Sequence, residues 1–282
     1  MRHLSALVAG FAAVSFGATI QYQTLDKAVI EQRLRSVGST DESRERIIRD
    51  LFVKAGCPSE ALQELPVRHV RAPNVLCSIP GQTDSVILVS AHFDFVRRGN
   101  GVIDNWSGAA LVPSLLESLS KTPRHHRFVF VCFTNEEEGM IGSKAYVHGL
   151  SKEQLHQISA VINLDSLATG PTKVEVDRGD KRLLLALSAI AQTLHLPLSA
   201  VNVHQVGRSD SDTFQDAGVP AITVHSITQE TLPILHSARD RMEAVKFNDY
   251  YDSYKLLAAY LAYLDGKLGS STETPAKVDP GR

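Results

Sequence analysis

Three short apolar runs in this chain each lead directly into side chains that can bind a metal ion. The runs and the side chains that follow them are 86–91 with His92 and Asp94, 128–133 with Glu136 and Glu137, and 160–164 with Asp165. Each run is continuous and rich in Val, Ile or Phe, which is typical of a strand buried on both faces of a parallel-type sheet. Open α/β sheets bind their ligands at the carboxyl ends of such strands. We therefore expect these polar side chains to converge at one edge of a sheet.

The remainder of the pattern alternates strands with helices. We expect a helix over residues 105–120, opened by Asp104, and a last helix over 247–264 that covers the sheet. This alternation predicts an α/β fold, a three-layer sandwich whose mixed, mostly parallel central sheet is flanked by helices. No internal repeat or linker divides the chain, so we expect one domain over residues 24–267.

Shorter patterns suggest where the other elements lie. Helical spacing favours helices over residues 24–36, 41–56, 143–150 and 180–194, and apolar runs favour strands over 67–70, 74–79, 172–176 and 220–224. We expect residues 67–70 and 74–79 to form edge strands. A Pro-Gly pair directly after residue 79 marks the end of the second one.

Charge and composition limit the classes of partner that this protein is expected to bind. The formal net charge is −2, and no stripe of Lys and Arg is interleaved with aromatic residues, so nothing predicts a nucleic-acid partner or an anionic membrane surface. Small or peptidic partners are therefore expected. The sequence contains no signal for an oligomeric state.

The two ends of the chain differ from its middle. Residues 1–18 have a basic residue, an apolar run and then small residues, which is the layout of a secretory signal peptide, and the run is shorter than the roughly 20 residues needed to span a bilayer. The alternative is a mature helix packed on the core. We expect export to the periplasm or the extracellular medium, no membrane span in the mature chain, and a disordered tail over residues 268–282.

The three cysteines do not form a disulfide framework or a Cys-x-x-Cys motif. An exported protein can join Cys57 to Cys77, and only their geometry decides whether the bond forms. Cys132 falls in the middle of an expected strand and is interpreted as a core residue.

Several of the polar side chains have a plausible metal-binding role. His92 and Asp94 are two residues apart, so in extended geometry both point to the same side, where the carboxylate can orient the imidazole for a metal ion. Taken alone, such a pair is more often a surface His and Asp at the end of a strand. Adjacent acids such as Glu136 and Glu137 can act separately, one as a metal ligand and one as a proton acceptor, although such a run is more often a solvated turn.

Two further residues complete the candidate set. Asp104 is expected at a helix start close to the strand that carries His92, where a carboxylate can bridge two metal ions, and its ordinary role there would be a helix cap. His236 follows the last expected strand. His225, at the end of that strand, is its nearest rival as a ligand, but it lacks the Ser-Ala-Arg-Asp sequence that follows His236.

Together, these motifs resemble the M28 family of co-catalytic zinc aminopeptidases, which are related to glutaminyl cyclases. The resemblance covers roughly residues 86 to 265. It rests on five motifs in the family's order, namely His92-Phe-Asp94, Asp104-Asn105 with Ser107-Gly108, Glu136-Glu137 with Gly139-Met-Ile-Gly142-Ser143, Asn163-Leu-Asp165, and His236 with Asp240.

The resemblance implies a role for each residue. His92 and Asp165 would hold one Zn²⁺, Glu137 and His236 a second, and Asp104 would bridge both. Glu136 would be the general base toward a metal-bridging water, with Asp94 behind His92. The substrates would be the N-terminal residues of peptides or proteins. The same ligands also suit Co²⁺ or Mn²⁺.

The sequence departs from the family pattern at one place and leaves two alternatives open. In residues 207–214 the family commonly has His or Tyr after Ser-Asp, whereas Ser211 and Asp212 occur here. Any role of that aromatic residue is therefore in doubt. The alternatives are a glutaminyl cyclase with a single zinc ion, and an inactive peptide-binding protein on the same fold, which a missing ligand or base would indicate.

Overall fold

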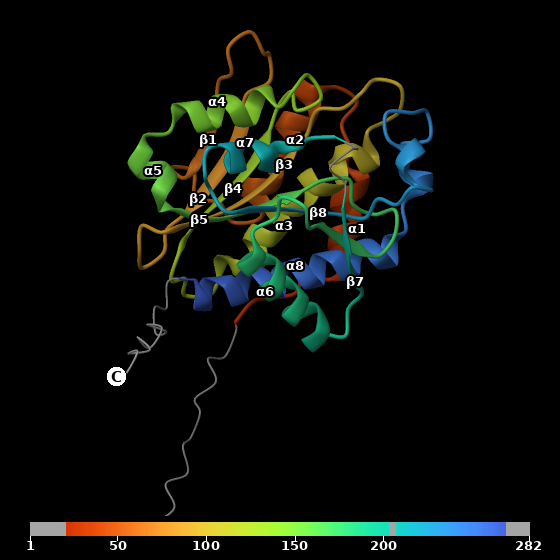
Figure 1. The fold of residues 1–282 in the computed structure, drawn as a ribbon. Helices are drawn as coiled ribbons and strands as arrows, with labels where there is room; N and C mark the ends of the chain where they lie inside the picture. Colours follow the sequence, from red (N-terminus) through yellow and green to blue (C-terminus); the bar gives the residue numbers. More distant parts are fainter. Residues whose placement is uncertain (1–20, 203–206, 269–282) are drawn as a thin grey trace, which may run out of the picture.

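An eight-stranded sheet runs through the molecule (Figure 1), and the computed structural model describes residues 21–202 and 207–268. The strands are β1 (Leu62–Leu65), β2 (Asn74–Ile79), β3 (Val86–His92), β4 (Arg127–Phe133), β5 (Ile158–Leu164), β6 (Thr172–Glu175), β7 (Leu198–Val201) and β8 (Ala221–His225). Their order across the sheet is β1-β2-β4-β3-β5-β8-β6-β7.

The middle of the sheet is parallel and its flanks are mixed. The neighbours β4, β3, β5 and β8 run parallel to one another, whereas β1 with β2, β2 with β4 and β6 with β8 are antiparallel. The expected mixed, mostly parallel sheet is confirmed. Because four parallel strands point the same way, their carboxyl ends lie at one edge of the sheet.

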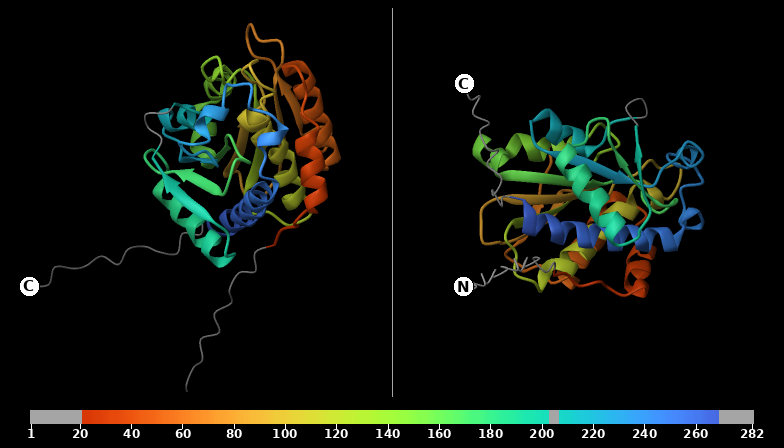
Figure 2. Two further views of the ribbon diagram at one scale, coloured as in Figure 1. Left: turned by 90° about the vertical axis from the view of Figure 1, so that its right-hand side faces the viewer. Right: turned by 60° about the horizontal axis from the view of Figure 1, so that its bottom comes forward.

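Helices cover both faces of the sheet. One face is covered by α1 (Lys27–Arg35), α2 (Asp41–Lys54), α3 (Ser107–Ser120), α6 (Lys181–Thr193) and α8 (Phe247–Lys267), whose apolar side chains join the larger core cluster. The other face is covered by α4 (Ile141–Gly149), α5 (Lys152–Gln157) and α7 (Asp210–Asp216), which pack on a smaller cluster. Figure 2 shows the long helix α8 running beneath the sheet. The three-layer sandwich is confirmed.

Burial of β3 on both of its faces explains why apolar and polar residues do not alternate along its sequence. Ile87 and Val89 belong to the larger cluster, whereas Leu88 belongs to the smaller one. All seven residues of β3 are buried. Since helices lie on both faces, both sets of side chains must be apolar. Cys132 of β4 is also fully buried, as expected of a core residue.

The structure differs from the sequence-based expectations at several elements, and α5, α7 and β7 were not expected at all. The strand expected at 67–70 is absent from the described residues, and the edge strand β1 lies at Leu62–Leu65 instead. β2 has the expected bounds but is not an edge strand, since it pairs with both β1 and β4. The helix α3 begins at Ser107, and the preceding Val102–Trp106 form a separate irregular turn, so Asp104 does not open the helix.

The two ends predicted from sequence cannot be compared. The expected signal peptide at residues 1–18 lies outside the described residues, as does the expected tail apart from Leu268. In the described parts of the chain, no helix has the length and apolar character to cross a membrane.

Cys57 and Cys77 are joined by a disulfide bond that ties the end of α2 to β2, with 6.2 Å between their Cα atoms. The bond closes a loop with a sequence separation of 20 residues. A loop of this size restricts the unfolded chain enough to contribute about 3 kcal/mol.

We therefore expect the double variant Cys57→Ala/Cys77→Ala to lose about 3 kcal/mol of unfolding free energy. Urea unfolding of both proteins under non-reducing conditions measures the difference. Adding a reductant should lower the stability of the original protein and leave the variant unchanged. Equal stability of the two oxidised proteins would mean that the bond does not stabilise the fold.

Candidate metal centre

Three of the four central parallel strands deliver a candidate ligand to the same edge of the sheet. His92 is the last residue of β3, Asp165 follows β5 directly, and Glu137 lies on the turn after β4. Asp104 and His236 enter from outside the sheet, from the turn before α3 and from the loop after β8. The convergence expected from the three apolar runs is therefore what the structure contains.

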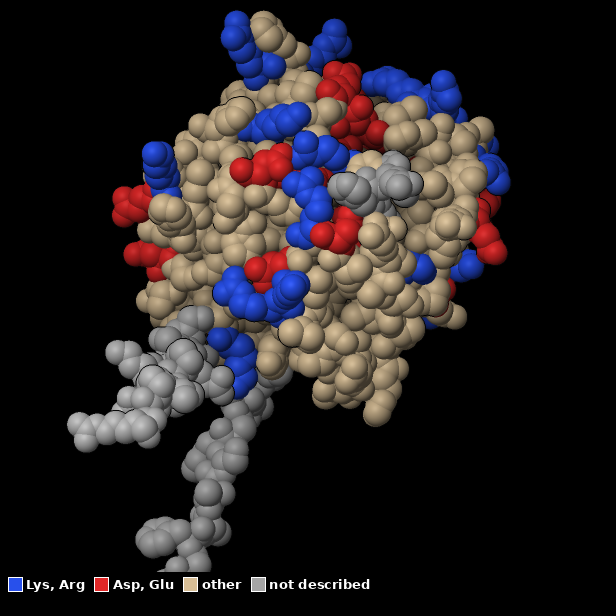
Figure 3. Space-filling model, viewed as in Figure 1, with Lys and Arg blue, Asp and Glu red and all other residues tan. Residues whose placement is uncertain are grey.

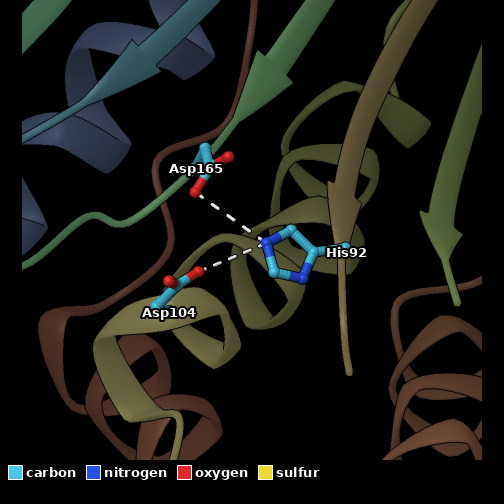
Figure 4. Close-up of side chains that lie close together, drawn as sticks. All are labelled: His92, Asp104 and Asp165. Carbon is cyan, nitrogen blue, oxygen red and sulfur yellow. Dashed lines mark ion pairs between the residues drawn. The ribbon is translucent and has the colours of Figure 1, made fainter. Parts of the chain in front are cut away.

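The first of two ligand groups contains His92, Asp104 and Asp165. Figure 4 shows both carboxylates directed at the imidazole of His92. His92 Nε2 lies 3.3 Å from Asp104 Oδ1 and 3.9 Å from Asp165 Oδ1. His92 and Asp104 are buried, and Asp165 is partly exposed. One donor atom from each residue lies within 4.8 Å of the others, so one cation can be reached by all three.

The second group contains Asp104, Glu137 and His236. His236 Nε2 lies 3.1 Å from Asp104 Oδ2 and 2.9 Å from Glu137 Oε2. Asp104 thus directs one oxygen into each group. His225 is in neither group, so the geometry favours His236 over this rival.

The donor set fits zinc or a similar divalent cation. Imidazole nitrogens and carboxylate oxygens are zinc ligands, and the open position of a catalytic site remains available because one side of the cluster faces a cleft. The cleft has a volume of about 430 Å³, and both groups line it. Glu137 Oε1 is buried without a hydrogen-bond partner among the described residues, which is costly unless a cation or water satisfies it.

The pKa values reflect how closely the groups interact. Although burial alone raises the pKa of Asp104, the hydrogen bonds with His236 and His92 together lower it below its usual range. The hydrogen bonds with Asp104 and Glu137 raise the pKa of His236 to about 10. Burial opposes the protonation of His92, but the carboxylates around it raise its pKa well above the ordinary value. In the absence of a metal ion, protons therefore balance part of the negative charge.

Asp94 lies behind the first group, where it contacts both sides of the site. Its Oδ1 lies 3.3 Å from His92 Nδ1. The same carboxylate accepts hydrogen bonds from the backbone N–H groups of Glu136 and Glu137, at 3.0 and 3.1 Å. Asp94 thus lies between the imidazole at the end of β3 and the two glutamates that follow β4, and it holds the backbone of those glutamates.

Glu136 lines the cleft but belongs to neither ligand group. Its Oε2 lies 3.9 Å from His92 Nε2. Burial is the main cause that raises the pKa of Glu136 to about 9, and neighbouring carboxylates add to it. A carboxyl group that lies beside both ligand groups, yet belongs to neither, is placed to exchange a proton with a molecule in the cleft.

Two residues that support the site were not recognised from sequence. Asn105 donates to Leu164 O at 2.8 Å and accepts from the N–H groups of Gly108 and Ser166. It therefore ties the turn that carries Asp104 to the end of β5. Its position directly after Asp104, in a motif shared with the resembled family, was the available signal.

Arg44 is the second of these residues. It is fully buried, and its guanidinium donates to the carbonyl oxygens of Phe93 at 2.9 Å and Gly101 at 3.1 Å while stacking 3.9 Å from the ring of Phe95. Burial lowers the pKa of Arg44 to about 10. The side chain thus links the two ends of the segment between His92 and Asp104 by hydrogen bonds. The helical position of Arg44 in the sequence contained no indication of this role.

The segment that departs from the family pattern lines the cleft with Gly207, Arg208 and Ser209, and its following residues are buried behind it. Ser209 and Ser211 both share hydrogen bonds with the hydroxyl group of Thr223 on β8, at 2.9 and 2.7 Å. Asp210 is fully buried, neither of its oxygens has a hydrogen-bond partner among the described residues, and burial raises its pKa to about 7. Ser211 is buried, so a His or Tyr at this position would not fit without rearrangement.

Asp240 holds the Asp104 turn through two backbone hydrogen bonds. Its carboxylate accepts from the N–H groups of Ile103 at 2.7 Å and Asp104 at 3.1 Å. We expect Asp240→Asn to weaken metal binding about tenfold, because an amide leaves one of these N–H groups without an acceptor. Competitive chelator titration measures the affinity. Asp84→Asn, at an exposed position, is the control, and equal affinity of both variants would contradict this role.

The chain resembles known peptidases. The family model described as peptidase family M28 matches residues 74–261. The aminopeptidase YwaD of Bacillus subtilis is 28% identical over 168 residues, which is 57% of this chain and 37% of that protein. The probable lipoprotein aminopeptidase LpqL of Mycobacterium tuberculosis is 31% identical over 168 residues, with 54% and 34% covered. The chain therefore spans about a third of the length of these relatives.

Solved structures share the fold. A zinc aminopeptidase from Bacillus subtilis superposes with a TM-score of 0.63 at 22% identity, over 68% of this chain and 50% of that chain. A glutaminyl cyclase from an Acidobacteriales bacterium superposes with a TM-score of 0.71 at 14% identity, over 91% and 99%. Since the family model also matches more than half of the sequence, the chain belongs to peptidase family M28.

Proposed function

We propose that this chain is an exported aminopeptidase that binds two zinc ions and removes N-terminal residues from peptides or proteins. The observation that carries the proposal is the pair of ligand groups that share Asp104 and lie beside the unligated Glu136. His92 and Asp165 would hold one ion, Glu137 and His236 the other, and Asp104 both. Co²⁺ or Mn²⁺ could occupy the same ligands.

Glu136 is the residue proposed to move the proton. When bound, two divalent ions would lower the pKa of a shared water and polarise the scissile carbonyl. Glu136 would accept the proton from that water and deliver it to the departing amine. Asp94 would act as a positioning residue, because it holds His92 and the backbone of Glu136 at once.

The same cleft would select a free N-terminus. The acidic side chains at its base attract a protonated α-amine, whereas an internal peptide bond has no such charge. We expect hydrolysis of aminoacyl substrates and no comparable hydrolysis of their N-acetylated counterparts, measured on matched pairs. Equal rates on free and blocked substrates would overturn the aminopeptidase proposal.

A glutaminyl cyclase is the second candidate, because the cyclase structure matches nearly the whole length of both chains. The two ligand groups favour the peptidase, since a cyclase would use one metal ion. Release of ammonia from peptides that begin with Gln, without hydrolysis of other N-terminal residues, would support the cyclase. An inactive binding protein is disfavoured because no expected ligand or base is replaced.

Export and domain organisation are part of the same proposal. The disulfide bond fits an oxidising compartment, which agrees with the signal-peptide pattern of residues 1–18. Residues 24–267 would form one peptidase domain. N-terminal sequencing of the protein recovered from its native compartment tests export, and an intact residue 1 in the secreted or periplasmic fraction would contradict cleavage.

A further inference from the structure

The cleft also contains a carboxylate, Glu175, that the proposed mechanism does not use. Glu175 is the last residue of β6, and it lines the cleft together with His225 and the apolar side chains of Ile227, Leu232 and Leu235. None of these residues belongs to a ligand group. A wall that combines one acid with apolar side chains suits a ligand with a cationic head on an apolar stem.

The arginines near this wall are already neutralised. Arg208, which lines the cleft, pairs with Asp216 and, at 3.8 Å, with Asp212. Arg178 pairs with the same two carboxylates, at 2.8 Å in the case of Asp216. The two arginines and two aspartates form a cluster without net charge, so Arg178 only partly offsets the neighbouring carboxylates that raise the pKa of Glu175. Figure 3 shows a similar mixture of basic and acidic side chains across the middle of one face.

The other basic groups near Glu175 do not neutralise it either. Lys173, two residues earlier on β6, donates to two backbone carbonyl oxygens at 3.1 and 3.3 Å. Burial lowers the pKa of His225 to about 4, so its imidazole is neutral at pH 7. Within residues 21–202 and 207–268, the side chain of Glu175 makes no hydrogen bond or ion pair. Burial followed by neighbouring carboxylates raises its pKa to about 8, against a smaller opposing effect of Arg178. A cationic group beside Glu175 would stabilise its ionised form, which burial and the neighbouring carboxylates disfavour.

We propose that Glu175 makes the cleft select peptides whose first residue has a cationic side chain, lysine or arginine. The inference rests on the proposed function, because the first side chain of an aminopeptidase substrate must lie beside the metal ligands. The charged head would pair with Glu175, and the methylene groups would pack on Ile227, Leu232 and Leu235. A cleft of about 430 Å³ has room for such a side chain.

Lysyl and norleucyl substrates test the proposal, since norleucine has the same four-carbon stem without the ammonium group. For the zinc-loaded protein we expect kcat/KM for the lysyl substrate to exceed that for the norleucyl substrate at least about tenfold. In Glu175→Gln the ratio should fall to about one. Because each variant provides its own ratio, a general loss of activity cancels. Glu153→Gln, an exposed position on α5 away from the cleft, should keep the original ratio.

Each outcome has a distinct meaning. Equal rates on both substrates in the original protein, or a lysine preference that persists in Glu175→Gln, would overturn the role of Glu175 while hydrolysis itself upholds the proposed aminopeptidase. No hydrolysis of any free aminoacyl substrate would overturn both proposals. Arginyl and citrullyl substrates provide a second matched pair, for which the same two ratios are expected.

Discussion

Replacing Glu136 by Gln should lower turnover by about 10²–10⁴-fold while the protein keeps its metal ions. The amide preserves the size of the side chain but cannot accept a proton from the attacking water. Glu136 belongs to neither ligand group, so its loss removes no metal donor. A large loss of kcat with unchanged metal content is the signature expected of a general base.

The neighbouring acid provides the control for this variant. Glu138 is exposed and follows Glu137 in the same run, so Glu138→Gln applies the same chemical change without touching the cleft. We expect Glu138→Gln to retain near-normal turnover and Glu136→Gln to lose it, with metal content measured by elemental analysis of both. Near-normal rates for Glu136→Gln would contradict the proposed role.

Replacing Asp104 by Asn should prevent most metal binding, because among the described residues this carboxylate is the one that belongs to both ligand groups and directs an oxygen into each. Asp165→Asn is the informative comparison, since Asp165 belongs only to the group of His92. We expect Asp104→Asn to reduce the occupancy of both positions and Asp165→Asn to reduce that of one. Metal content after equilibrium dialysis against limiting zinc measures the difference.

Thermal unfolding shows whether Asp104→Asn loses metal binding while the rest of the protein stays folded. A metal ion that binds only the folded protein stabilises it by about 2.7 kcal/mol at a hundred times its dissociation constant. We expect zinc to raise the melting temperature of the original protein and to have little effect on Asp104→Asn. Without metal, the variant should be less stable than the original, because the Asp104 carboxylate pairs with the protonated imidazoles of His92 and His236. Full metal content in Asp104→Asn would contradict a shared ligand.

The strand ends were predictable because burial on both faces imposes a local pattern. A run such as residues 128–133 has no polar alternation, so its ends mark where the chain leaves the core. His92 and Asp165 lie at such ends and could be placed by counting residues. The edge strand at Leu62–Leu65 was missed because none of its residues is fully buried, and its sequence has little periodicity.

The rest of the site depends on contacts between distant residues. Asp104 was expected to open a helix, but its turn is held by Asp240, 136 residues away in sequence. Arg44 meets the carbonyl oxygen of Phe93 across 49 residues. Such contacts leave no local pattern, and only the family resemblance related these segments to one site. The acid Glu175 lay inside the strand expected at residues 172–176 and had no motif that would distinguish it.

Zinc titration of the metal-free protein, monitored by hydrolysis of an unblocked aminoacyl substrate, tests the central claim most directly. With the protein well above the dissociation constants, activity should rise until two zinc ions are present per chain and then level off. A plateau at one ion per chain would contradict the proposed two-metal site.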